Sequence, residues 1–147
     1  MSDPDAIDRK ILALLRADSR ISNADLAAQV GLSPSSCWRR VRALEESGAI
    51  RRYTVDLDDA ATGLGFKAIV HVQMTRHDQA LVRDFIRAIR TKDEVRACYA
   101  TSGASDYHLH IACANLAAYN RFLEDFLFTL PAVASAQTNL VLRVVKE

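Results

Sequence analysis

Three arginines crowd one short segment of the chain, LSPSSCWRRVRAL at residues 32–44. Arg39, Arg40 and Arg42 each carry a guanidinium group, which can clamp a phosphate or hold the edge of a guanine through two parallel hydrogen bonds. Serines precede them, and small hydroxyl groups can donate hydrogen bonds to phosphate oxygens. This chemistry suits a surface that binds nucleic acid, provided that one element turns the guanidinium groups outward together.

A helix would present these groups in that way. At about 100° per residue, Cys37, Val41 and Leu44 fall on one apolar stripe, and Arg39 and Arg42 point away from it. A major groove admits a helix with such a face. The alternative is a solvated charged face whose arginines pair with the neighbouring glutamates. The residues predicted to contact DNA are Ser33, Ser35, Ser36, Arg39, Arg40 and Arg42 on the helix, with Arg51 and Arg52 beyond it.

Two further helices are predicted to support the arginine helix. Apolar spacing over residues 7–15 predicts the first, and the S-x-x-D sequence at 22–25 opens the second. Gly31 suits the end of that helix, Ser33-Pro34 opens the third, and Gly48 ends it. Three short helices with a glycine-containing turn predict a helix-turn-helix domain over residues 1–50. Residues 50–57 read as a strand, and the region 51–65 is interpreted as strand and linker.

The rest of the chain, residues 66–147, has the alternating rhythm of strands and helices. The predicted order β-α-β-β-α-β is the ferredoxin-like pattern, so the whole chain is assigned to the α+β class with a winged-helix-like first domain. The open sheet face carries Ile69, Val141 and Val145, which predicts that a second subunit covers it. The predicted elements are strands at 66–74, 95–101, 107–113 and 133–145, and helices at 81–89 and 116–130.

The composition sets limits on the classes of protein to consider. The chain has 147 residues, of which 50% are hydrophobic and 25% charged, so it can form one medium domain or two small ones. The net charge of +1 means that any basic surface is local. Acids near the N-terminus argue against a signal peptide, no apolar run predicts a membrane span, and three spaced cysteines predict no disulfide framework. A cytoplasmic protein is expected.

Histidines supply the main alternative. His108 and His110 form an H-x-H pair on one face of a predicted strand, and His71 could join them to hold a metal. The rival hypothesis is therefore a small ferredoxin-like metabolic enzyme or metal-binding protein with a helical appendage. Polar residues facing solvent or a subunit interface are the simpler interpretation, in which case the histidines are candidate pH-sensitive contacts. No catalytic group with a supported geometry is identified, so no enzyme, cofactor or metal is predicted.

Two long segments resemble a known family. Residues 7–58, from IDRKILALL to RRYTVDLD, resemble the DNA-binding half of the Lrp/AsnC (feast/famine) transcriptional regulators. TSGASDYHLH at 101–110 and AYNRFLEDFLFTLPAVASAQTNLVLRVVK at 118–146 resemble that family's effector-sensing and assembly half. The resemblance implies a sequence-specific regulator of transcription that binds double-stranded DNA as a homodimer, assembles further to a tetramer or octamer, and has no membrane partner.

The resemblance also implies a site for a small effector, typically an amino acid, near the turn between the second and third strands of the second domain. Members often carry an acid directly after the glycine of this turn, where this chain has Ala104. The effector-binding residues implied are Thr101, Ser102, Gly103, Ala104, Asp106 and Tyr107, with Ser135, Gln137 and Thr138 at the start of the last strand.

Overall fold

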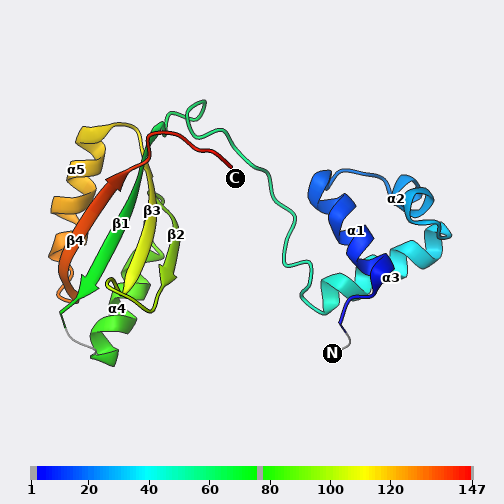
Figure 1. Ribbon diagram of the computed structural model, residues 1–147, viewed down its shortest axis with the longest axis horizontal. Helices are drawn as coiled ribbons and strands as arrows, with labels where there is room; N and C mark the ends of the chain where they lie inside the picture. Colours follow the sequence, from blue (N-terminus) through cyan, green and yellow to red (C-terminus); the bar gives the residue numbers. More distant parts are fainter. Residues whose placement is uncertain (1–2, 76–77, 147) are drawn as a thin grey trace. The chain divides into compact units, whose positions relative to one another are not determined.

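The computed structural model describes residues 3–75 and 78–146 and divides into two units, one up to Asp56 and the other from Leu57 (Figure 1). The first unit contains the helices α1 (Ala6–Ala17), α2 (Asn23–Val30) and α3 (Pro34–Glu46). A small core of Ile11, Leu26, Ala27, Cys37 and Leu44 joins them. The three predicted helices are confirmed.

Side-chain caps account for where these helices begin. Asp5 and Asp8 form a capping box at the start of α1, Ser22 accepts a hydrogen bond from the Asp25 N–H at the start of α2, and Ser33 caps α3. Gly31 ends α2 with φ at 73°, a left-handed conformation that favours glycine. The turn between α2 and α3 therefore depends on having a glycine at position 31.

The strand predicted for residues 50–57 is wrong. Residues 51–58 have no regular secondary structure, and the alternating side chains of Tyr53, Val55 and Leu57 are 51%, 75% and 61% exposed. An extended segment becomes a strand only when a neighbour pairs with its backbone, and the described part of the chain supplies no such neighbour to this segment.

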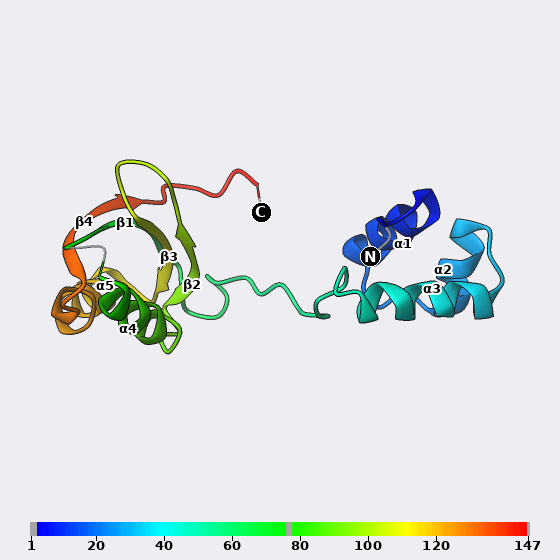
Figure 2. The same ribbon diagram turned by 90° about the horizontal axis from the view of Figure 1, so that it is seen from below.

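The second unit is a four-stranded antiparallel sheet in the order β2-β3-β1-β4, as predicted for a ferredoxin-like domain. The helices α4 and α5 cover one side, and the β2–β3 loop reaches out on the other (Figure 2). Val70, Val72 and Leu109 of the sheet are fully buried and belong to the same core as the buried Phe85 and Leu127, which follow in the helical segments. The elements are β1 (Phe66–Met74), α4 (Gln79–Ile89), β2 (Val95–Ala100), β3 (Tyr107–Cys113), α5 (Leu116–Asp125), the short 3-10 helix η1 (Leu127–Thr129) and β4 (Val133–Leu140).

Two predicted elements of this unit are too long. The predicted helix at 116–130 ends at Asp125, because the backbone at Phe126 leaves the helical region with φ at −130° and ψ at −67°. The predicted strand at 133–145 ends at Leu140, opposite Ala68 of β1, and one further backbone hydrogen bond, from the Val141 N–H to the Lys67 carbonyl at 3.0 Å, follows it. Within the described residues, no helix is long and apolar enough to cross a membrane.

Candidate nucleic-acid interface and ligand cavity

The first turn of α3 gathers three hydroxyl groups. Ser33 Oγ accepts from the backbone N–H of Ser36 at 3.3 Å, lies 3.2 Å from Ser35 Oγ, and donates to Ser36 Oγ at 3.0 Å. Ser33 and Ser35 are exposed. The positive end of the helix dipole lies at the same place, so this turn offers hydroxyl and N–H donors of the kind that phosphate oxygens accept.

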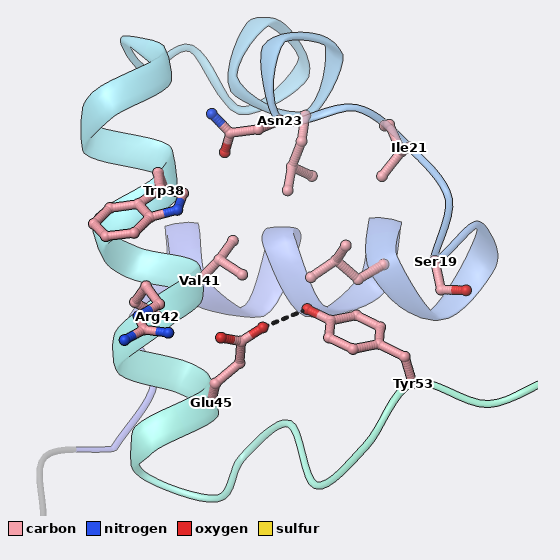
Figure 3. A pocket seen from close by; sticks show the side chains of 10 residues that line it. Ser19, Ile21, Asn23, Trp38, Val41, Arg42, Glu45 and Tyr53 are labelled. Carbon is pink, nitrogen blue, oxygen red and sulfur yellow. Dashed lines mark hydrogen bonds between the residues drawn. The ribbon is translucent and has the colours of Figure 1, made fainter.

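Two of the three arginines point outward from α3. Arg39 and Arg42 are exposed, and Arg39 makes no ion pair with any described residue. The Arg42 guanidinium lies 5.7 Å from the ring centre of Trp38, a cation–π distance, and Figure 3 shows the two side chains one helical turn apart. Its pairing with Glu46 is long, at 3.7 Å between exposed atoms, and such a pair contributes little. Both guanidinium groups remain available to another molecule.

Arg40 is directed to α1 instead. Its Nη1 atom donates to Asp5 Oδ2 and to Asp8 Oδ1, each at 2.8 Å. The backbone N–H of Asp8 and the Arg40 guanidinium both favour the ionised form of Asp5, so the pKa of that carboxyl lies below its ordinary value. Arg40 thereby links the middle of α3 to the capping box of α1 and does not share the outward face of Arg39 and Arg42.

Arg51 and Arg52 lie exposed in the chain that leaves α3. One residue later, the Tyr53 hydroxyl donates to Glu45 Oε1 at 2.9 Å, so the chain returns against α3 (Figure 3). Burial, and then the Glu45 carboxylate, raise the pKa of Tyr53 above its ordinary value. This contact keeps the two arginines close to the C-terminal end of α3.

The second unit has a cavity of about 540 Å³ on the sheet face that the helices leave uncovered. Five residues predicted from the family resemblance line it, namely Thr101, Ser102, Gly103, Ala104 and Gln137. Four further lining residues, His71, Ser105, His108 and Asn139, were not among the predicted effector-binding residues.

Two other predicted residues hold the rim of the cavity. The Asp106 carboxylate accepts from the Met74 N–H at 2.7 Å, and Ser135 Oγ donates to Gln73 Oε1 at 2.9 Å. The same Gln73 side chain donates through Nε2 to the Ala104 carbonyl at 2.8 Å. These bonds fasten the β2–β3 turn and β4 to β1, so Asp106 and Ser135 shape the cavity without lining it.

The last two predicted residues face the helices. The Tyr107 ring packs 4.9 Å from that of Phe85, and Thr138 Oγ1 lies 2.5 Å from the Tyr119 hydroxyl. Successive side chains of a strand point to opposite faces, so Tyr107 lies on the other side of the sheet from its cavity-lining neighbour His108.

The two histidines of the cavity contact each other. The strand register places His71 opposite His108, and their Nδ1 atoms lie 2.6 Å apart. On the far side of the first ring, Asn139 Nδ2 lies 3.0 Å from His71 Nε2. Both ring nitrogens of His71 are therefore engaged. Among the residues that the structure describes, no group of three or more histidines, cysteines or acids could hold a metal ion.

Comparison with family models matches both units. Residues 4–51 match a winged helix-turn-helix DNA-binding domain, and residues 67–147 match the Lrp/AsnC ligand binding domain. Similar curated proteins include the HTH-type transcriptional regulator AldR of Mycolicibacterium smegmatis, 40% identical over 95% of this chain and 81% of its own length. The leucine-responsive regulatory protein of Escherichia coli is 36% identical over 99% of this chain and 88% of its own length.

Solved structures agree with these matches. A transcriptional regulator from Neisseria meningitidis in complex with L-Met has a TM-score of 0.93 and 34% identity, covering 97% of this chain and 92% of its own. An AsnC family transcriptional regulator from Agrobacterium tumefaciens has a TM-score of 0.92 and 31% identity, covering 97% and 93% of the two chains.

Proposed function

The chain belongs to the Lrp/AsnC family of transcriptional regulators, and on that premise we propose which of its residues bind DNA and what kind of molecule controls it. It is a DNA-binding regulator built from a helix-turn-helix unit and a ligand-binding unit.

The outward face of α3 enters a major groove. Arg39 and Arg42 contact base edges and phosphates, while Ser33, Ser35 and Ser36 hold a phosphate at the first turn. Arg51 and Arg52 add contacts to the DNA backbone. Arg40 acts indirectly by bracing α3 against α1, because its guanidinium is bonded to Asp5 and Asp8. The observation that carries the proposal is the division of α3 into a buried stripe of Cys37 and Leu44 and an exposed guanidinium face.

Titration of the protein onto its own promoter fragment at several salt concentrations tests this interface. Neutralising phosphates releases condensed counterions, so the logarithm of the binding constant is expected to fall linearly with the logarithm of the salt concentration. A scrambled fragment of equal length is the control and is expected to bind more weakly with a similar salt dependence. Affinity that does not change with salt, or equal affinity for both fragments, would refute groove recognition by α3.

A small metabolite, most simply a free amino acid, binds the cavity of the second unit and alters DNA binding. The Neisseria meningitidis relative was crystallised with L-Met, and the cavity residues Thr101 to Ser105 offer hydroxyl and backbone groups to a ligand of that size. A thermal-shift screen of the full-length chain against all amino acids tests the effector, because a ligand of the native state raises its melting temperature. Failure of every amino acid to stabilise the protein would refute it.

The regulator acts as a homodimer that assembles to a tetramer or octamer in the cytoplasm, without catalytic activity or cofactor. Exposed apolar side chains support association, among them Val55 and Leu57 before the sheet and Leu142 and Val145 after it. Light scattering coupled to size-exclusion chromatography measures the mass directly. A monomer at micromolar concentration would refute the assembly while leaving the DNA-binding proposal intact.

A further inference from the structure

We propose that the cavity binds the carboxylate of its ligand by taking up one proton on the His71–His108 pair, so that occupancy rises as pH falls. The inference rests on the proposed function because it concerns the same cavity. The carboxylate is the group that the cavity recognises, and pH controls how tightly the cavity holds it.

The charges of the cavity point to this pair. Its nine lining residues include no aspartate, glutamate, lysine or arginine, and His71 and His108 are the two whose side chains can accept a proton to become cations. Moving a carboxylate out of water is unfavourable unless a cation or several hydrogen bonds replace the water. Within the lining, only an imidazole can become that cation.

The geometry of the pair limits it to a single positive charge. A distance of 2.6 Å between the two Nδ1 atoms requires one nitrogen to donate and the other to accept, so one proton lies between them. If both imidazoles were protonated, their two Nδ1–H groups would face each other at this distance. The pair is therefore either neutral or carries one added proton, on an Nε2 atom. Asn139 can accommodate that proton beside His71 Nε2, since its amide can turn its oxygen to accept.

Neighbouring elements bring two other titratable groups, Tyr99 and Asp106, near the pair. From β2, Tyr99 lies opposite His108 in the sheet, and its ring contacts that of His110 at 5.5 Å between centres. Just before β3, the Asp106 carboxylate accepts from the Met74 N–H. From β4, Gln137 and Asn139 are uncharged. Asp106 does not line the cavity.

The cavity lining suits a ligand with one carboxylate. It contains no aspartate or glutamate to pair with the ammonium group of an amino acid. A 2-oxo acid is therefore expected to bind about as well as the amino acid with the same side chain, and the amine that lacks the carboxylate is expected not to bind. Because the bound state holds one more proton than the free state, linkage makes the affinity rise as pH falls, by up to about tenfold for each pH unit.

Isothermal titration calorimetry of the full-length chain tests the proposal. The probes are L-methionine and L-leucine, their 2-oxo acids, and the amines left after removal of their carboxylates, each at pH 6 and pH 8. Tighter binding of the acids at pH 6, with proton uptake revealed by buffers of different ionisation enthalpy, is expected. Amino acids that bind equally at both pH values, or amines that compete with them, would overturn the inference and leave the proposed effector function standing. If no probe binds at either pH, both fail.

Matched histidine variants assign the effect to the pair. His108→Gln is expected to abolish the pH dependence and to weaken binding at pH 6 by about tenfold or more, as loss of a hydrogen bond to a charged group does. His110→Gln, on the same strand and face but outside the cavity, is expected to keep both the affinity and the pH dependence. Circular dichroism and melting temperature check that each variant folds. A folded His108→Gln protein that retains the pH dependence would overturn the proposal.

Discussion

The two regions proposed to bind DNA and effector are built in opposite ways. The α3 surface comes from one run of residues, 33–42, whose side chains are sorted inward and outward by helix geometry alone. The cavity is assembled from β1, the β2–β3 turn, β3 and β4, with residues up to 68 positions apart in the sequence in direct contact. A local surface depends on the folding of one helix against its neighbours, whereas the cavity depends on strand register.

Destabilising the hydrophobic core of one unit should have the largest effect, because it should abolish the binding activity of that unit and spare that of the other. Ile11 is fully buried at the centre of the first unit, so Ile11→Ala is expected to destabilise that unit by about 2–5 kcal/mol. DNA binding should then be lost while ligand binding in the second unit persists. Urea denaturation monitored by circular dichroism and by ligand binding measures both. The mirrored change Ile111→Ala, in the second core, should reverse the pattern. Equal loss of both activities in both variants would contradict the separation.

Removing one outward arginine tests the local surface without disturbing its fold. Arg39→Ala is expected to weaken binding to the promoter by about 1–3 kcal/mol if the guanidinium contacts a base, with unchanged melting temperature. Gel shift at fixed salt measures the loss. Arg87→Ala removes the same charge from the exposed surface of α4 and should leave binding unchanged. If Arg39→Ala binds as the unmodified chain does, Arg39 is not a contact.

The anchoring of the β2–β3 turn can be tested at Asp106. Asp106→Ala leaves the Met74 N–H without its acceptor and is expected to cost the second unit about 1–3 kcal/mol of stability. Asp106→Asn keeps an oxygen at the same place and should cost less. Thermal unfolding compares the two variants. Ligand binding that survives Asp106→Ala undiminished would show that the turn does not need this anchor.

The smallest expected effect concerns the Arg40 contact in the first unit. The pKa of Asp5 is lowered in the folded chain, so its contribution to stability is complete above the ordinary carboxyl pKa of about 3.9. That contribution is lost as pH falls through the lower pKa of the folded state. Melting temperatures of the unmodified chain and of Asp5→Asn should therefore differ slightly at pH 7 and converge at the most acidic pH that the fold tolerates. A difference that grows on acidification would contradict this assignment.

The sequence predicted the helices of the first unit and the order of the second because both follow from local signals. Caps at Ser22 and Ser33, the left-handed turn at Gly31 and the apolar stripe of α3 are all readable within a few residues. The direction of the Arg40 side chain could not be predicted from local signals, because its partners Asp5 and Asp8 lie 35 and 32 residues away in the sequence.

The cavity was predicted only in part. The turn at Thr101 to Ala104 was found through a family resemblance, but the pairing of His71 with His108 depends on the register of β1 against β3, which periodicity does not determine. Strand alternation alone would have separated Tyr107 from His108, because adjacent residues cannot both face the same cavity. The strand predicted at 50–57 failed for a related reason, since pairing requires a partner that the local pattern cannot reveal.

The Gln73 side chain has a consequence for how quickly a ligand can enter. Its amide is fixed at both ends, by the Ala104 carbonyl and by the Ser135 hydroxyl, so the turn is braced before anything binds. A ligand then has no loop to order on arrival and loses little affinity to ordering entropy. Association should therefore proceed in a single concentration-dependent phase in stopped-flow measurements, without a slow step of closure.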